Sequence, residues 1–170
     1  MIIRQEEPKD YEAVYHVVKA AFGSAEHTDG NEQDLVNALR KSKSFIPALS
    51  LVAEQDGKVT GHILFTEVKV GGTVQLALAP LSVLPAFQKQ GIGKALIRAG
   101  HEKAAALGYL YSIVLGSERY YPQMGYLPAG QYGIKPPFDV PSENFMACKL
   151  AMDAPAVSGT VQYAEEFGIG

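Results

Sequence analysis

Apolar residues near the start of the chain recur with the period of a helix. After a short strand-like run at Ile2–Gln5, Pro8 stands where a first helical turn tolerates proline, and Gly23 ends the pattern. A second, weaker amphipathic stretch covers about residues 31–41, with Asn31 as its candidate cap. The pattern therefore predicts one strand followed by two helices. The apolar face of the first helix comprises Tyr11, Val14, Tyr15, Val18, Ala21 and Phe22.

The period changes to that of strands after the second helix. Three consecutive runs are rich in Val, Ile, Leu, Phe and Thr, and tight turns join them at Asp56-Gly57 and at the glycine pair 71–72. Consecutive strands joined by tight turns pair antiparallel, so we expect a meander. The three runs are Ala48–Glu54, Lys58–Val70 and Val74–Val83.

Helix and strand patterns alternate again in the second half of the chain. A helix is predicted at about Gly91–Leu107, an apolar strand at Tyr109–Gly116, a helical turn at Glu118–Met124 and a strand at Asn144–Met152. The order is β-α-α-β-β-β-α-β-α-β-β without a linker, so we expect one mixed α/β domain over residues 1–152. Because a free tail seldom carries spaced aromatic residues, residues 153–170 are expected to form a C-terminal extension packed on the same domain.

Composition narrows the class of protein without naming its chemistry. The 170 residues are 47% hydrophobic and carry a net charge of −3, so the chain can build one core and lacks the basic excess of a nucleic-acid-binding protein. Cys148 is the single cysteine, which excludes a disulfide framework and a Cys-x-x-Cys pair. The spacing of His16, His27 and His101 predicts no metal site.

The same composition bears on location. The first ten residues hold five charges, and the most apolar run, 76–87, is interrupted by prolines and too short to span a bilayer. We therefore expect a cytoplasmic protein with no membrane partner. The sequence leaves open whether the chain forms a homodimer.

A glycine-rich segment at the start of the third helix is the most informative stretch of the chain. The N-terminus of a helix presents unpaired N–H groups, and glycines let a phosphate approach them, so residues 88–94 predict a site for a phosphorylated ligand. Two nucleotide-binding motifs fail on particular residues. A Rossmann fingerprint needs a glycine where Leu96 stands, and a Walker A loop needs Gly at Gln88 and Ser or Thr at Ala95.

The Q-x-x-G-x-G pattern of this segment, in this order of elements, resembles the GNAT superfamily of acyl-CoA-dependent N-acyltransferases. The resemblance extends over most of the chain and is strongest at residues 81–93, 113–116 and in the run Tyr-Tyr-Pro-Gln-Met-Gly-Tyr at 120–126. It implies a mostly antiparallel, twisted sheet of about seven strands flanked by helices. The strands ending at Val83 and Gly116 are expected to splay apart, with the pantetheine arm of CoA between them. Pro80 marks a bulge or an edge in the first of these strands.

The same resemblance assigns the cofactor-binding residues. The pantetheine arm is expected to bond the backbone near Leu81 and Val83, and backbone N–H groups from Gln88 to Lys94 to cradle the CoA pyrophosphate. Lys94 and Arg98 could also touch CoA phosphates, although an exposed helix face is the simpler reading of Arg98. The expected cofactor-binding set is Leu81, Ser82, Val83, Gln88, Lys89, Gln90, Gly91, Ile92, Gly93 and Lys94.

Acyl transfer from a thioester needs an oxyanion donor, a proton for the departing thiolate and a neutral amine. The backbone N–H of Val83 or Leu84 is the expected donor, and the resemblance points to Tyr121 as the general acid, with Tyr120 as the alternative. A phenol is protonated at neutral pH and suits an alkanethiolate of similar basicity. The base stays open among several groups. The candidates are Glu67, His62, Glu118 and a chain of waters, and an amine that arrives neutral would need no base.

These expectations combine into an enzyme that moves an acetyl group from acetyl-CoA to a primary amine by direct attack, with no metal. The acceptor is a small-molecule, peptide or protein amine that the sequence does not identify. Cys148 stands in an alternating strand and suits the core better than an acyl-enzyme route. The alternative function is a catalytically silent acyl-CoA sensor, which would keep residues 88–94 without depending on Tyr121.

Overall fold

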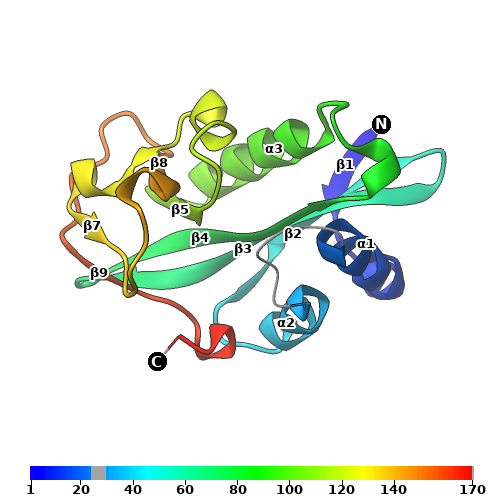
Figure 1. The fold of residues 1–170 in the computed structure, drawn as a ribbon, viewed down its shortest axis with the longest axis horizontal. Helices are drawn as coiled ribbons and strands as arrows, with labels where there is room; N and C mark the ends of the chain where they lie inside the picture. Colours follow the sequence, from blue (N-terminus) through cyan, green and yellow to red (C-terminus); the bar gives the residue numbers. More distant parts are fainter. Residues whose placement is uncertain (24–29, 170) are drawn as a thin grey trace.

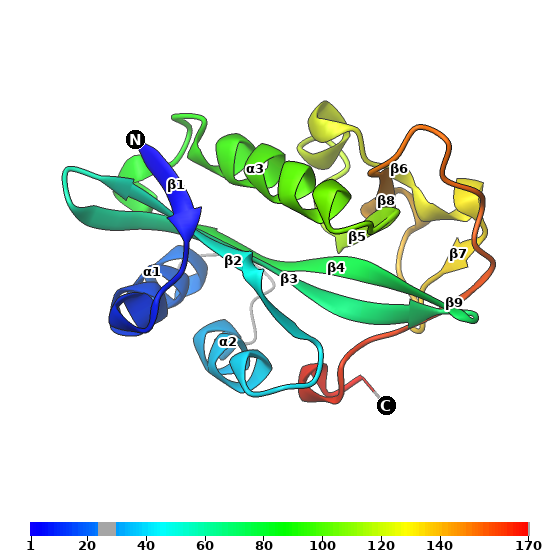
Figure 2. The same ribbon diagram turned by 180° about the vertical axis from the view of Figure 1, so that it is seen from behind.

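A computed structural model of the chain describes residues 1–23 and 30–169. A central sheet separates two layers of helices (Figure 1). Helix α3 (Ile92–Ala106) covers one face, and α1 (Tyr11–Gly23) and α2 (Glu32–Arg40) cover the other, as the view from behind also shows (Figure 2). Among the described residues, no helix is long and apolar enough to cross a membrane.

Seven strands follow one another across the sheet in the order β1-β2-β3-β4-β5-β8-β6. Neighbours on this path pair antiparallel except β4 and β5, which pair parallel. The expected mixed α/β sheet of about seven mostly antiparallel strands is therefore confirmed. The strands on the path are β1 (Ile2–Gln5), β2 (Phe45–Gln55), β3 (Lys58–Val70), β4 (Thr73–Val83), β5 (Tyr111–Leu115), β6 (Leu127–Pro128) and β8 (Phe145–Lys149).

Two more short strands lie off this path, β7 (Ile134–Lys135) and β9 (Gly159–Gln162). Strand β9 pairs with the end of β3 and with β7, and it brings the C-terminal segment alongside the meander. Short 3-10 turns join the remaining elements. Two of them concern the site, η2 (Pro85–Phe87) and η3 (Tyr121–Met124).

Particular residues explain where several of these strands and helices turn, bend or begin. Asp56 and Gly57 both have positive φ, as the two-residue turn between β2 and β3 requires. The pairing of β3 with β4 shifts in register between Leu78 and Leu81, so the bulge expected at Pro80 is present. Asn31 does stand at the start of α2, but its side chain makes no capping hydrogen bond, and its carbonyl accepts the first backbone bonds instead.

The two faces of β3 supply two separate cores. Ile63 and Phe65 pack with α3, and Leu64 packs with α1 and α2 on the other face. The ring of Phe65 occupies the space where a side chain at Gly100 would stand, so α3 lies close against the sheet. This packing fixes where the N-terminus of α3 points.

Candidate cofactor-binding and active site

The N-terminus of α3 presents backbone donors that the helix does not use. Gly91 precedes the helix with φ of 86°, and the first helical bond runs from the Ala95 N–H to the Gly91 carbonyl at 3.0 Å. The N–H groups of Ile92, Gly93 and Lys94 therefore point out of the helix end. Together with the positive end of the helix dipole, they suit a phosphate group.

The loop before the helix is held by its own side chains. The Gln88 side chain donates from Nε2 to the Val83 carbonyl at 3.1 Å, which ties the loop to the end of β4. Lys89 adopts a φ of 63°, an unusual value for a residue other than glycine. The Gln90 side chain is exposed and donates to the Ala86 carbonyl at 3.4 Å. These two side-chain bonds therefore tie the loop to the end of β4 and to η2.

A groove of about 480 Å³ opens beside this helix end. All of the expected cofactor-binding residues line it except Ser82 and Gln90. Ala21 and Phe22 reach the groove from the C-terminal end of α1, and their place on the apolar face of a helix did not mark them as groove residues in the sequence. The other lining residues are Leu81, Val83, Phe87, Gln88, Lys89, Gly91, Ile92, Gly93, Lys94, Tyr120 and Gln123.

Strands β4 and β5 diverge next to this groove. Their parallel pairing is confined to Leu76 with Ser112 and Ala77 with Ile113, although β4 continues to Val83. The Leu84 N–H donates to the Thr60 carbonyl at 2.9 Å.

Alternate residues of an antiparallel strand turn their backbone groups toward the same neighbour. Since the backbone of Leu84 faces β3, the backbone groups of Leu81 and Val83 face away from β3. They face the gap that opens where β4 and β5 diverge, which we call the wedge. The Leu84 N–H is thus occupied, which leaves Val83 as the available oxyanion donor of the two expected candidates.

The two adjacent tyrosines occupy different places. The Tyr121 ring lies on Gly116 at the end of β5 and packs edge-to-face on Tyr126, whose centroid is 5.6 Å away. Burial raises the pKa of Tyr121 above its ordinary value, which keeps the phenol protonated. The Tyr120 hydroxyl lies beside Gly93 and lines the groove. Burial also raises the pKa of Tyr120.

The three side chains considered as base have distinct surroundings. The Glu67 carboxylate accepts a hydrogen bond from the Tyr109 hydroxyl at 2.6 Å, far along β3 from the groove. Glu118 is exposed, and hydrogen bonds from its own backbone N–H and from the Asn144 side chain lower its pKa. His62 is fully buried on the face of β3 that carries Leu64, directly opposite Ser82 of β4. Only His62 is adjacent to a residue of the expected cofactor-binding set.

The remaining described candidate groups lie outside the groove. Cys148 is buried in the core, and burial raises the pKa of its thiol to about 11. His101 contacts the Tyr126 hydroxyl at 3.0 Å through Nε2, and Arg98 is exposed outside the groove. Within residues 1–23 and 30–169, no cluster of His, Cys, Asp and Glu could hold a metal ion. His27 lies outside the described residues.

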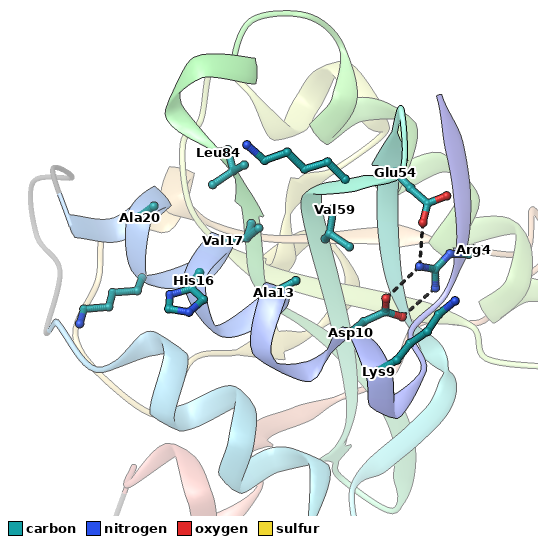
Figure 3. Close-up of a pocket in the computed structure, with 13 residues that line it drawn as sticks. Arg4, Lys9, Asp10, Ala13, His16, Val17, Ala20, Glu54, Val59 and Leu84 are labelled. Atoms are coloured by element: carbon teal, nitrogen blue, oxygen red, sulfur yellow. Dashed lines mark hydrogen bonds and ion pairs between the residues drawn. The ribbon is translucent and has the colours of Figure 1, made fainter.

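A second and larger groove, of about 940 Å³, lies between α1 and the hairpin of β2 and β3 (Figure 3). Its floor is an ion-pair cluster in which Arg4 contacts Asp10 at 2.7 Å and Glu54 at 3.0 Å. The Arg4 guanidinium lowers the pKa of Asp10. Of the expected site residues only Leu84 lines this groove, and its N–H is already bonded to the Thr60 carbonyl, so size alone does not identify the site.

Comparison with known proteins agrees with this geometry. The sequence profile of the acetyltransferase (GNAT) family matches residues 11–126. The chain is 36% identical to the N-acetyltransferase YjhQ of Escherichia coli K12, over 92% of this chain and 88% of YjhQ. It is 30% identical to the N-acetyltransferase YhbS of the same strain, over 98% of both chains.

Solved structures of acetyltransferases are also similar to this chain. A GNAT family acetyltransferase from Brucella melitensis, in complex with acetyl-CoA, superposes with a TM-score of 0.81 at 34% identity, covering 98% of this chain and 97% of that one. YhbS from Escherichia coli, in complex with CoA, superposes with a TM-score of 0.86 at 28% identity, covering 98% and 91%.

Proposed function

The chain belongs to the GNAT family of acetyltransferases, and from this membership we propose that it moves the acetyl group of acetyl-CoA to a primary amine by direct attack. One observation carries the proposal. The free N–H groups at the start of α3 and the wedge between β4 and β5 meet at one groove, as a long phosphorylated thioester requires. The acetyl-CoA and CoA complexes of the two related structures support the choice of donor.

We assign the parts of CoA to particular residues. The pyrophosphate binds the backbone N–H groups between Gln88 and Lys94, and the glycines at 91 and 93 let it approach them. The pantetheine arm enters the wedge and pairs with the backbone of Leu81 and Val83, in place of the missing part of β5. The thioester then lies between the end of β4 and Tyr121.

The reaction follows from this placement. The amine attacks the acetyl carbonyl, and the Val83 N–H stabilises the tetrahedral oxyanion. The carbon–sulfur bond then breaks, and the Tyr121 hydroxyl gives its proton to the departing thiolate. Cys148 takes no part because it is buried with a thiol pKa of about 11, which supports direct transfer over an acyl-enzyme.

The experiment is acetyl transfer measured on a panel of amines. Purified protein is mixed with acetyl-CoA and small polyamines, amino acids, aminoglycosides or peptides, and both thiol release and acetylated product are measured. We expect stoichiometric thiol and product with at least one amine. A protein that binds CoA and acetylates none of them would be the outcome of a silent CoA sensor and would overturn the proposed function.

A further inference from the structure

A chain of buried polar side chains crosses the sheet toward the cofactor wedge. It starts at the ion pair between Arg40 of α2 and Glu6, which follows β1, with an N–O distance of 2.5 Å. The Ser50 hydroxyl of β2 donates to Glu6 Oε1 at 2.9 Å, and His62 Nε2 of β3 lies 2.9 Å from the same hydroxyl. Side chains from α2, β2, β3 and the segment after β1 thus form one path that ends beside Ser82 of β4.

This path fixes the tautomer of His62. A serine hydroxyl has one proton, and Ser50 donates it to the Glu6 carboxylate. Ser50 can therefore only accept from His62, so Nε2 carries the ring proton. In the neutral ring, Nδ1 is then a free acceptor.

Two atoms at the end of the path lack partners. Within residues 1–23 and 30–169, neither His62 Nδ1 nor Ser82 Oγ has a hydrogen-bond partner, although both are buried. His62 and Ser82 are directly opposite one another, so both side chains project from the same face of the sheet, about 5 Å apart at Cβ. A buried polar atom without a hydrogen-bond partner destabilises the fold, and a buried water bound to both atoms removes that penalty.

We propose that His62 Nδ1 and Ser82 Oγ hold one buried water, and that this water takes the proton of the attacking amine. The inference rests on the proposed function. Neither His62 nor Ser82 lines the groove, but Ser82 lies between Leu81 and Val83, which do, so this water would link the two buried side chains to the place proposed for the thioester. Two protein partners leave the water free to make a third hydrogen bond, to the amine.

The proton transfers balance. As the amine nitrogen bonds to the acetyl carbon, its proton passes to the water, and a proton of the water passes to His62 Nδ1. Tyr121 supplies a different proton to the sulfur as the carbon–sulfur bond breaks. The imidazolium finally returns its proton, through water, to the Tyr121 phenolate, which restores both groups.

The surroundings of His62 suit an acceptor. Burial lowers the pKa of His62 to about 4, so the ring is neutral at pH 7. Glu6 lies 3.8 Å from Nε2 and stabilises the transient imidazolium, whereas Arg40 opposes it. On the same face, α1 packs with the valines at 14, 17 and 18, which bring no further charge.

Two variants and a matched control test the assignment. His62→Gln keeps a donor near the Nε2 position for Ser50 but removes the acceptor at Nδ1, and Ser82→Ala removes the second ligand of the water. We expect kcat at pH 7 to fall roughly 100-fold and about tenfold, respectively, with the KM for acetyl-CoA unchanged. Thr66→Val is the control, because Thr66 carries the third unpartnered buried atom, on the same face of β3, four residues away.

The pH profile separates proton transfer from a structural role. The deficit of His62→Gln should shrink as pH rises, because hydroxide and free amine replace the lost acceptor, and a packing defect would not follow pH in this way. Wild-type kcat in both variants, or a deficit that is constant with pH, would overturn the proposal.

A spectroscopic measurement decides the assignment without an acceptor. The 15N chemical shifts of His62 at pH 7 should report a protonated Nε2 and an unprotonated, hydrogen-bonded Nδ1. A protonated Nδ1 would contradict the proposal even in an active enzyme. If instead the wild-type protein acetylates no amine, the proposed function fails while this measurement still decides the state of His62.

Discussion

At the scale of single residues, two adjacent tyrosines occupy different positions. Tyr120 reaches the groove at the helix end, where its hydroxyl stands beside Gly93. Tyr121 lies deeper, on Gly116 and Tyr126, at the end of the strand that borders the wedge. Under the proposed function, a residue beside the pyrophosphate-binding loop affects CoA binding, whereas one at the wedge affects the chemical step. Their hydroxyls should therefore be separable by kinetics.

We predict that Tyr121→Phe lowers kcat by roughly 100-fold and leaves CoA affinity near its wild-type value, because it removes one proton donor from a buried site. Tyr120→Phe should instead weaken CoA binding by roughly fivefold, the equivalent of about one hydrogen bond. Steady-state kinetics and calorimetric CoA titration measure the two effects. A large kcat loss in Tyr120→Phe with none in Tyr121→Phe would exchange the two roles.

At the scale of elements, the proposed function has the N-terminus of α3 bind the CoA pyrophosphate through its backbone, so the absence of side chains matters there. A Cβ at Gly93 would overlap the Tyr120 hydroxyl and stand 3.6 Å from a methyl group of Leu81. We predict that Gly93→Ala lowers CoA affinity at least tenfold by calorimetry, although alanine favours the helix itself by about 1 kcal/mol. Gly130→Ala is the matched control, since a Cβ there meets no atom within 4 Å. Equal affinities would remove the steric argument.

The sequence predicts best the elements whose signals are local. Lys58–Val70 and Ile2–Gln5 have the expected bounds, because alternation and turn residues lie within each segment. Strands β6 and β7 have two residues each and carry no period, so they are defined only by the neighbours they pair with. Likewise, the glycine segment and the tyrosine pair could be read in the sequence, but which of the two tyrosines borders the groove could not.

The buried path to His62 was invisible in the sequence for a related reason. Glu6 is more than 30 residues before Arg40 and Ser50 in the chain, and each of the three looks like an ordinary surface or strand residue on its own. Only the packing of α2 and the middle of β2 against the segment after β1 brings their side chains together. Contacts of this kind need the whole molecule.

At the scale of the whole molecule, two buried histidines make stability depend on pH. Burial lowers the pKa of both His62 and His101 to about 4, from an ordinary value of 6.5. Between these values the unfolded chain binds more protons than the folded one, so stability falls as pH decreases through this window. At pH 5 the loss is about 2 kcal/mol for each histidine.

We predict that the free energy of unfolding in urea falls by up to about 4 kcal/mol from pH 7 to pH 5. His101→Gln should remove about half of this dependence, and the exposed His16 supplies the control variant His16→Gln, which should leave it unchanged. If the slopes of wild type and His101→Gln are equal, the burial of His101 is not the cause.

The C-terminal segment bears on the limits of the folding unit. We propose that residues 153–170 are an extension of the single domain formed by residues 1–152. Val70 of β3 is paired with Val161 of β9, and the Tyr111 hydroxyl donates to the Pro155 carbonyl at 2.8 Å. Val157 and Val161 are buried against β3 and its neighbours. The segment therefore completes a third hydrophobic cluster, which also contains Val68 and Val70 of β3 and Tyr111 of β5.

We predict that truncation after Met152 lowers the free energy of unfolding by roughly 3–5 kcal/mol, the value of burying two valine side chains, out of the 5–15 kcal/mol typical of a domain. Since the shortened chain could aggregate, Val161→Ala provides a milder test with an expected loss of about 1–2 kcal/mol. Val74→Ala is its control, because Val74 is 48% exposed. Unchanged stability after truncation would mean that the extension is separable, and CoA affinity measured on the same protein would show whether the site depends on it.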